Sequence, residues 1–343
     1  MDSTFFEKLP KIELHAHLNG SLKMESIQEL GMQLYGENSA DFLGRIQEFT
    51  AFPEEMDADK LSKCFQKFAF MHELTSTKKG LQLATHLVIR DFARDNVVYL
   101  ELRTTPKHNE HMTRKEYLET ILNAIEEAKG RYPGILVKLL VSIDRSQVIE
   151  AATDIVNLTM YMKKNYPNII KGMDLSGNPA KGNFNDFMHL LEKVKASDLK
   201  LALHCAEIEN EKETQQMLDF NFERCGHGTY LSVPQQMEQC KRQQITVECC
   251  LTSNVKCGTV KHYEAHHFKT LRDNGIKTVI CTDDCGVFDS TLSQEFAIAA
   301  RVFSLDKNDI CDLCINAIDA AFCDNTEKLD LRQQIDRFFA KNK

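Results

Sequence analysis

The chain has no excess of positive charge. Of its 343 residues, 42 are Lys or Arg and 50 are Asp or Glu, so the formal net charge at pH 7 is −8. A protein without a basic field does not concentrate nucleic acid or an anionic membrane at its surface. The composition therefore argues against nucleic acid polymers and membranes as partners.

The sequence also lacks a long apolar run. No segment is uniformly apolar over the roughly 18 residues that a membrane-spanning helix needs. The first eleven residues carry Asp2, Glu7 and Lys8 where a secretion signal has its apolar core. We therefore expect a soluble protein that is not exported and is located in the cytosol.

Repeats, low-complexity tracts and Pro/Gly/Ser-rich linkers are missing as well. With 43% hydrophobic residues, the chain can fill one large core, since α/β barrels commonly exceed the usual domain length. We expect residues 1–343 to form a single domain, and nothing in the sequence requires more than a monomer.

Cysteine is abundant, but its placement is not that of a disulfide framework. The chain has 12 cysteines, many of them inside apolar runs, as Cys249, Cys250 and Cys281 are. Such positions are typical of buried thiols in a reducing compartment. Cys311 and Cys314 form a C-x-x-C spacing, but they lie in an amphipathic helical pattern with no second Cys or His pair nearby, so we expect no metal or redox site there.

Eight short apolar runs bounded by turn residues predict eight β-strands. They cover residues 11–18, 97–105, 135–144, 169–177, 200–207, 224–228, 245–251 and 277–284. Between them, apolar positions recur every three or four residues, which predicts helices. Apolar strands that alternate with helices favour a parallel sheet covered on both faces, and eight such units favour an α/β fold closed as a (β/α)8 TIM barrel.

The weakest of these strands is the sixth, at 224–228, and without it an open doubly wound sheet is the alternative. The ionisable residues, however, come at the C-terminal ends of nearly all the runs. A barrel concentrates its chemistry at those ends, whereas an open sheet uses only a switch point. Three further helical patterns follow residue 284 and are expected on the outside of the barrel, at 293–303, 309–322 and 328–339.

Four of the ionisable residues have the character of metal ligands. His15 and His17 are two positions apart on one strand, so their side chains point the same way. A His-x-His pair alone is weak evidence, because histidines in sheets are often only hydrogen-bonded. With His204 and Asp283 the set becomes three nitrogens and one oxygen, which suits one zinc ion per chain. Such an ion lowers the pKa of a water toward neutrality and so supplies a nucleophile.

Three more residues are candidates for proton transfer. Glu207 follows His204 by three positions, and a carboxyl held against an apolar substrate has a raised pKa and can act as a general acid. Alone, it reads as a surface glutamate at a helix start. His227, between two glycines, and Asp284, beside Asp283, are expected to orient the attacking water and hold its proton. Gly-His-Gly by itself is typical of a turn.

Six motifs in one order resemble a known family. HAHLNGS, MDLSGNP, HCAE, RCGHG, LTSN and TDD are similar to those of the adenosine deaminase family of metal-dependent hydrolases, most closely its adenosine deaminase-like branch, over about residues 7–322. The resemblance implies zinc at the four ligands above and Glu207 as the acid that protonates the purine ring nitrogen beside the attacked carbon. It also implies substrate contacts from His17, Glu207, Gly177, Asp283 and Asp284.

One departure from the family pattern bears on the substrate. Family members that act on free adenosine carry Asp two residues after the second His, where this chain has Asn19. A carboxylate beside a phosphate is a costly like-charge contact, whereas a neutral amide can donate to the phosphate. We therefore expect a purine nucleoside monophosphate as substrate, with N6-methyl-AMP converted to IMP and methylamine. The alternatives are deamination of free adenosine and a barrel that binds a nucleotide without catalysis.

Cations and hydroxyls suited to the phosphate lie at the end of the second predicted strand. The candidate contacts there are Arg103, Thr104, Thr105, Pro106 and Lys107. Resemblance to the nucleotide-acting branch adds His72 and Asp144. The alternatives are a solvated loop for Lys107, a helix surface for His72, and a structural pair of Arg103 with Glu101 or another barrel carboxylate. Helices between Ser26 and Phe92 are expected to form a lid, with residues 36–57 as its mobile part.

Overall fold

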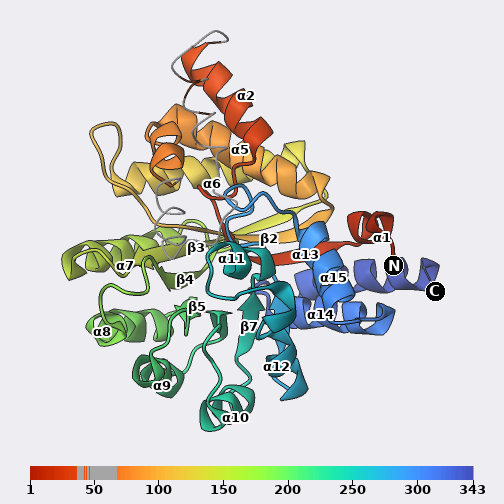
Figure 1. The fold of residues 1–343 in the computed structure, drawn as a ribbon. Coiled ribbons are helices and arrows are strands. Elements are labelled where there is room, and N and C mark those ends of the chain that lie inside the picture. The colour runs from red at the N-terminus through yellow and green to blue at the C-terminus, as the bar shows by residue number, and fades with distance from the viewer. Residues whose placement is uncertain (37–41, 43, 45, 47–67, 343) are drawn as a thin grey trace.

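The computed structural model describes residues 1–36, 42, 44, 46 and 68–342. Eight parallel strands pair in chain order within them (Figure 1). They are β1 (Lys11–His17), β2 (Val97–Thr104), β3 (Leu136–Asp144), β4 (Ile170–Ser176), β5 (Lys200–Cys205), β6 (Arg224–His227), β7 (Thr246–Cys249) and β8 (Thr278–Ile280). Each strand begins within one residue of its predicted start, and the weak run at 224–228 forms β6.

The sheet closes on itself between its first and last strands. Ala16 of β1 forms a parallel bridge with Asp283, just beyond β8. The Asp283 amide donates to the His15 carbonyl at 2.8 Å, and the His17 amide donates to the Asp283 carbonyl at 3.2 Å. The predicted (β/α)8 barrel is therefore confirmed, and the open sheet is excluded because it leaves these two edges apart.

Helices surround the strands (Figure 1). The described helices are α1 (Ser3–Lys8), α2 (Met24–Tyr35), α5 (Lys78–Arg94), α6 (Arg114–Arg131), α7 (Ile149–Lys163), α8 (Phe184–Lys195), α9 (Glu211–Phe220), α10 (Pro234–Arg242), α11 (Leu251–Lys256), α12 (Phe268–Asp273), α13 (Leu292–Val302), α14 (Lys307–Ala320) and α15 (Asn325–Lys341). The last three confirm the extra C-terminal helices, and α14 packs against β8 and β1.

Helix α6 illustrates how local sequence places a side chain at the barrel mouth. Thr113 and Glu116 form a capping box, in which the Glu116 amide donates to Thr113 Oγ1 at 3.3 Å and the Thr113 amide donates to Glu116 at 2.9 Å. The apolar face that follows includes Tyr117, which is 1% exposed. Its ring packs in the core while its hydroxyl reaches the site described below.

The buried hydrophobic side chains form one cluster that links the strands to the surrounding helices. Among the described helices, none has both the length and the apolar character needed to cross a membrane. The stretch at 36–57, expected to be the mobile part of a lid, lies almost wholly outside the described residues, as do positions 61–67 of the helical pattern that precedes Leu74.

Candidate active site

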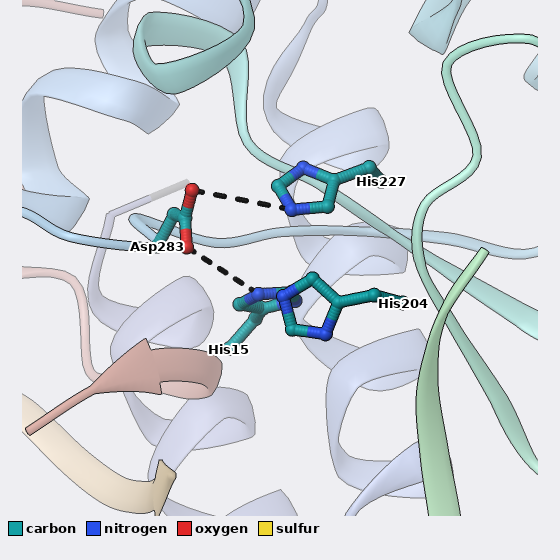
Figure 2. A group of neighbouring side chains, drawn as sticks. All are labelled: His15, His204, His227 and Asp283. Carbon is teal, nitrogen blue, oxygen red and sulfur yellow. Dashed lines mark ion pairs between the residues drawn. The ribbon is translucent and has the colours of Figure 1, made fainter. Parts of the chain in front are cut away.

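The four predicted metal ligands meet at the C-terminal end of the barrel. His17 Nε2 lies 3.2 Å from His204 Nε2 and 3.4 Å from Asp283 Oδ1. His15 Nε2 lies 3.5 Å from the same Asp283 oxygen. Figure 2 shows Asp283 between the rings of His15 and His227, with His204 beside them. Strand β1, strand β5 and the segment after β8 therefore aim their donor atoms at one point.

Carboxylates behind two of the histidines set which ring nitrogen faces that point. His15 Nδ1 bonds Glu248 Oε2 at 2.8 Å, and His204 Nδ1 bonds Asp174 Oδ1 at 2.9 Å. A carboxylate accepts, so each Nδ1 carries the proton and each Nε2 presents a lone pair, as in metal-binding histidines.

The centre of the histidine cluster is suited to a positive charge. His15 Nε2 is fully buried and has no hydrogen-bond partner among the described residues. Burial and Arg103 lower the pKa of His15, but the nearby carboxylates of Asp283 and Glu248 outweigh them and raise the pKa to about 9. The nearby carboxylates stabilise a positive charge at His15 Nε2. With protein atoms alone this charge is a proton, and a divalent ion bound by three imidazoles and a carboxylate can take its place. The residues present therefore fit a metal site.

Geometry alone admits a second ligand set. His15, His204, His227 and Asp283 also have ligand atoms that lie within 4.8 Å of one another. This set exchanges the predicted His17 for His227. Zinc sites use about four protein or water ligands. We therefore expect only one of His17 and His227 to coordinate the metal, and the other to have a different role.

Beneath the histidines the barrel interior holds a network of buried charges that sequence reasoning missed. Glu248 Oε1 accepts from Arg224 Nε at 2.6 Å, and Glu248 Oε2 accepts from Arg103 at 2.5 Å. Burial raises the pKa of Glu248, but the two guanidinium groups outweigh it and hold the pKa well below its usual range. The available signal was an isolated acid inside three of the apolar runs, namely Glu101, Asp174 and Glu248. Such residues are almost never fully buried unless they are paired.

The structure places Arg103 in this buried network, and its contact with a phosphate stays a prediction. Its side chain has no exposed surface, and its terminal nitrogens lie 3.0 Å from the Leu14 carbonyl and 3.6 Å from Asp174 Oδ1. Like the bond to Glu248, these contacts occupy the guanidinium inside the barrel. Arg103 thus pairs with barrel carboxylates, as the structural alternative proposed, and its partners are Glu248 and Asp174 rather than Glu101.

The proposed proton-transfer residues surround the same centre. Glu207 follows β5 with a side chain only 18% exposed, and its Oε2 lies 3.7 Å from His227 Nε2. Burial raises the pKa of Glu207, so its protonated form is favoured more than that of an ordinary glutamate. Asp284 lies against Gly20, where a Cβ atom would come 1.7 Å from Asp284 Oδ1. Glycine at position 20 therefore lets Asp284 reach the barrel mouth.

The backbone is strained at several of these strand ends. Ala206, His227 and Asp283 have φ angles of +54°, +65° and +64°. Residues other than glycine rarely adopt this left-handed region, and such strain concentrates at functional sites. The conformation turns the side chains of His227 and Asp283 across the mouth of the barrel rather than along the strands.

A cavity of about 710 Å³ opens at this end of the barrel, a size that falls within the range of ligand pockets. The predicted residues that line it are His17, Asn19, His72, Thr104, Thr105, Lys107, Asp144, Gly177, His204, Glu207, His227, Asp283 and Asp284, together with Arg103 at its floor. Pro106 is buried but is not part of the lining.

Gly177 lines the cavity in a conformation that needs glycine. Its φ is +98°, and a Cβ atom there would lie 2.2 Å from Asp144 Oδ1. Any side chain would both strain the backbone and displace Asp144. The site therefore keeps the backbone of residue 177 open to a ligand.

Hydrogen bonds hold Asn19 in one orientation. Its Nδ2 donates to Thr75 Oγ1 at 2.8 Å, and its Oδ1 accepts from the Tyr117 hydroxyl at 3.2 Å. Thr75 in turn donates to the Met71 carbonyl at 2.9 Å, so its hydroxyl can only accept from Asn19. Tyr117 also bonds Thr104 Oγ1 at 2.8 Å. Sequence reasoning missed Thr75, in a turn, and Tyr117, on α6, because they carry no motif and are distant from residue 19 in the sequence.

Comparisons with known proteins agree over nearly the whole chain. The family model described as "Adenosine deaminase" matches residues 10–338. The chain is 49% identical to the adenosine deaminase-like protein of Drosophila melanogaster, with 97% of both chains covered. It is 40% identical to the N6-methyl-AMP deaminase of Bos taurus, over 97% of this chain and 95% of the relative.

A solved structure agrees as well. The crystal structure of Arabidopsis ADAL complexed with IMP has a TM-score of 0.86 at 36% identity, over 97% of each chain. The order of the strands, the convergent His and Asp side chains and these full-length matches lead to one conclusion: the chain belongs to the adenosine deaminase family.

Proposed function

We propose that the protein is a zinc-dependent hydrolase that removes methylamine from N6-methyl-AMP and releases IMP. The observation that carries the choice of a nucleotide is Asn19, a neutral amide in the same cavity as the histidine cluster. Relatives named N6-methyl-AMP deaminase and an IMP complex of a similar protein support the same substrate class.

His15, His17, His204 and Asp283 are the residues that we expect to hold the zinc. When bound, a zinc ion lowers the pKa of water and supplies a nucleophile at neutral pH. Asp283 is itself positioned by Ser253, whose hydroxyl donates to Asp283 Oδ2 at 2.6 Å. This bond leaves Oδ1, which faces His15 and His17, available to the ion.

Glu207 is the general acid in this proposal. Burial raises its pKa and so favours the protonated form, and a proton given to the purine ring nitrogen makes the adjacent carbon more electrophilic. Asp284 and His227, which line the same cavity, orient the attacking water and receive or donate its protons. Collapse of the tetrahedral adduct then expels methylamine.

Lys107 is the cation that we assign to the phosphate. Burial lowers the pKa of His72 to about 4, and the charge of Lys107 adds to this effect, so His72 is neutral at pH 7. Burial also lowers the pKa of Lys107, although Asp144 opposes the shift. A phosphate in the cavity stabilises the Lys107 ammonium, and Thr105 and Asn19 provide neutral contacts.

The test of this function is a parallel assay of adenosine, AMP and N6-methyl-AMP. We expect the highest kcat/KM for N6-methyl-AMP. A preference for unphosphorylated adenosine refutes the argument from Asn19 and favours ordinary adenosine deamination. Elemental analysis of the same preparation addresses a purine-binding barrel without catalysis, which has no need of stoichiometric zinc.

Asn19→Asp is expected to reduce kcat/KM for the nucleotide by at least about tenfold, because the new carboxylate faces the phosphate in a partly desolvated cavity. The kcat/KM for adenosine should change much less. Asp matches Asn in shape and can still accept from Tyr117, but Thr75 must turn its hydroxyl proton from the Met71 carbonyl toward the new carboxylate. The kcat/KM for adenosine therefore reports the structural cost of the substitution, and the ratio of the two values isolates the effect on the phosphate. Steady-state kinetics with both substrates check the prediction, and an unchanged ratio of the two kcat/KM values contradicts it.

We also propose that residues 1–343 act as one domain, as a monomer and in the cytosol. One hydrophobic cluster and the buried free thiols of Cys225, Cys249 and Cys281 support this view. Analytical ultracentrifugation of the zinc-loaded protein tests the monomer: a stable dimer at micromolar concentration contradicts it.

A further inference from the structure

A chain of hydrogen bonds leads from a backbone amide to the ring of His227. The Phe268 amide donates to His266 Nδ1 at 3.1 Å, and His266 Nε2 lies 3.0 Å from Asn254 Oδ1. On the other side of the Asn254 amide, Nδ2 lies 3.5 Å from His227 Nδ1. All three side chains are at most 5% exposed, so water does not compete freely for these contacts.

The direction of every bond in this chain follows from its first donor. A backbone amide can only donate, so His266 Nδ1 must accept and the His266 proton must be on Nε2. That Nε2–H donates to Asn254 Oδ1, which turns Asn254 Nδ2 toward His227. Burial lowers the pKa of His266 well below its ordinary value, in line with a neutral ring.

Two threonines support the same orientation of the Asn254 amide. Nδ2 also lies 3.3 Å from Thr259 Oγ1 and 3.4 Å from Thr229 Oγ1. Thr259 donates its own proton to the Asn254 carbonyl at 3.1 Å, so its oxygen is an acceptor toward Nδ2. Reversing the amide would place a carbonyl oxygen among acceptors and an NH₂ group against the His266 Nε2–H.

His227 therefore differs from its neighbours in the cluster. Carboxylates hold the protons of His15 and His204 on Nδ1, whereas an NH₂ group faces Nδ1 of His227. Its Nε2–H then points toward Glu207 Oε2 at 3.7 Å and Asp283 Oδ2 at 4.0 Å. A nitrogen that carries a proton has no lone pair for a metal.

We propose that Asn254 and His266 are positioning residues that hold His227 as the Nε2–H tautomer, which keeps it out of metal coordination and makes it a hydrogen-bond donor to the attacking water. This inference rests on the proposed hydrolytic function for its role in turnover, and on the hydrogen bonds alone for the tautomer. It selects His17 over His227 as the third nitrogen ligand. It also leaves Asp284, rather than His227, as the group that can take the first proton from water.

Histidine-selective ¹⁵N NMR of the zinc-loaded, full-length protein tests the tautomer directly, with the His227→Asn spectrum used for assignment. We expect the His227 signals to show a protonated Nε2 and an unprotonated Nδ1. Because this measurement uses wild-type protein without substrate, it does not depend on the reaction. A His227 ring protonated on Nδ1, or with Nε2 bound to zinc, overturns the proposal.

Asn254→Asp is the matching variant, since a carboxylate of the same shape accepts where the amide donates. It should move the His227 proton to Nδ1 in the NMR spectrum and lower turnover at least about a hundredfold, with zinc content unchanged. Asn308→Asp is the control, because it makes the same isosteric change at an exposed position of α14, away from the cavity; we expect its turnover within about threefold of wild type.

The outcomes separate this inference from the proposed function. Full activity in Asn254→Asp with a moved proton overturns the role in turnover. An inactive wild type with the Nε2–H tautomer present counts against the proposed substrate and leaves the tautomer established.

Discussion

Glu207→Gln is expected to lower turnover of N6-methyl-AMP by at least roughly a hundredfold while the protein retains its zinc, the effect expected for loss of a general acid. The amide has nearly the shape of the acid, so the lining of the cavity is preserved. It cannot give a proton to the purine ring, however, and the ring carbon stays a poor electrophile. Turnover under saturating substrate and metal content by elemental analysis are the two measurements.

Glu209→Gln provides the matched control for that experiment. Glu209 lies two positions further along the same segment but is exposed to solvent. Its replacement makes the same chemical change in the same loop at a residue that does not line the cavity, so turnover should stay within about twofold of wild type. If Glu207→Gln keeps more than about a tenth of the wild-type turnover, the proton comes from another group and the assignment of the acid is wrong.

Glu248→Gln is expected to lower the free energy of unfolding by about 3–5 kcal/mol, because breaking a buried ion pair leaves charges without compensation. Both Arg103 and Arg224 lose the carboxylate that they share inside the barrel. The variant also loses the charged partner of His15 Nδ1, and loss of such a partner weakens metal binding about 10- to 100-fold.

Denaturant unfolding and zinc competition with a chelator measure these two effects separately. Glu223→Gln is the control, since Glu223 pairs with Lys200 at 3.1 Å but is 40% exposed. Exposed pairs contribute at most about 1 kcal/mol, so this variant should unfold near the wild-type midpoint and bind zinc normally. Equal stability of Glu248→Gln and Glu223→Gln would mean that the interior network tolerates a missing charge.

Much of the fold follows from local patterns in the sequence. Alternation of apolar runs and helical periodicity predicted all eight strands, because burial on both faces of a parallel strand requires nearly continuous apolar residues. The short β6 is the instructive case. Its apolar run is weak on its own. The ionisable residues at the ends of nearly all the strands favoured a closed sheet, which requires this strand, and β6 is present.

Arg103 shows what sequence reasoning about the site could not decide. Its place at a strand end suggested either a phosphate ligand or a structural pair with a barrel carboxylate, and β2 buries it in the barrel interior. The alternation of side chains predicts a face and not the partner across the barrel. Glu248 and Asp174, the carboxylates that hold it, come from strands that are distant in sequence.

The sequence alone specified the barrel, the location of the site at the C-terminal ends of the strands, and the side chains that suit a metal. These features depend on periodicity and composition, which can be read along one strand at a time. Three features required the three-dimensional arrangement: the proton positions on the histidines, the fixed amides of Asn19 and Asn254, and the charge network around Glu248. Each depends on atoms from several strands and helices meeting within about 3 Å, and hydrogen-bond direction at that range is decided by tertiary packing.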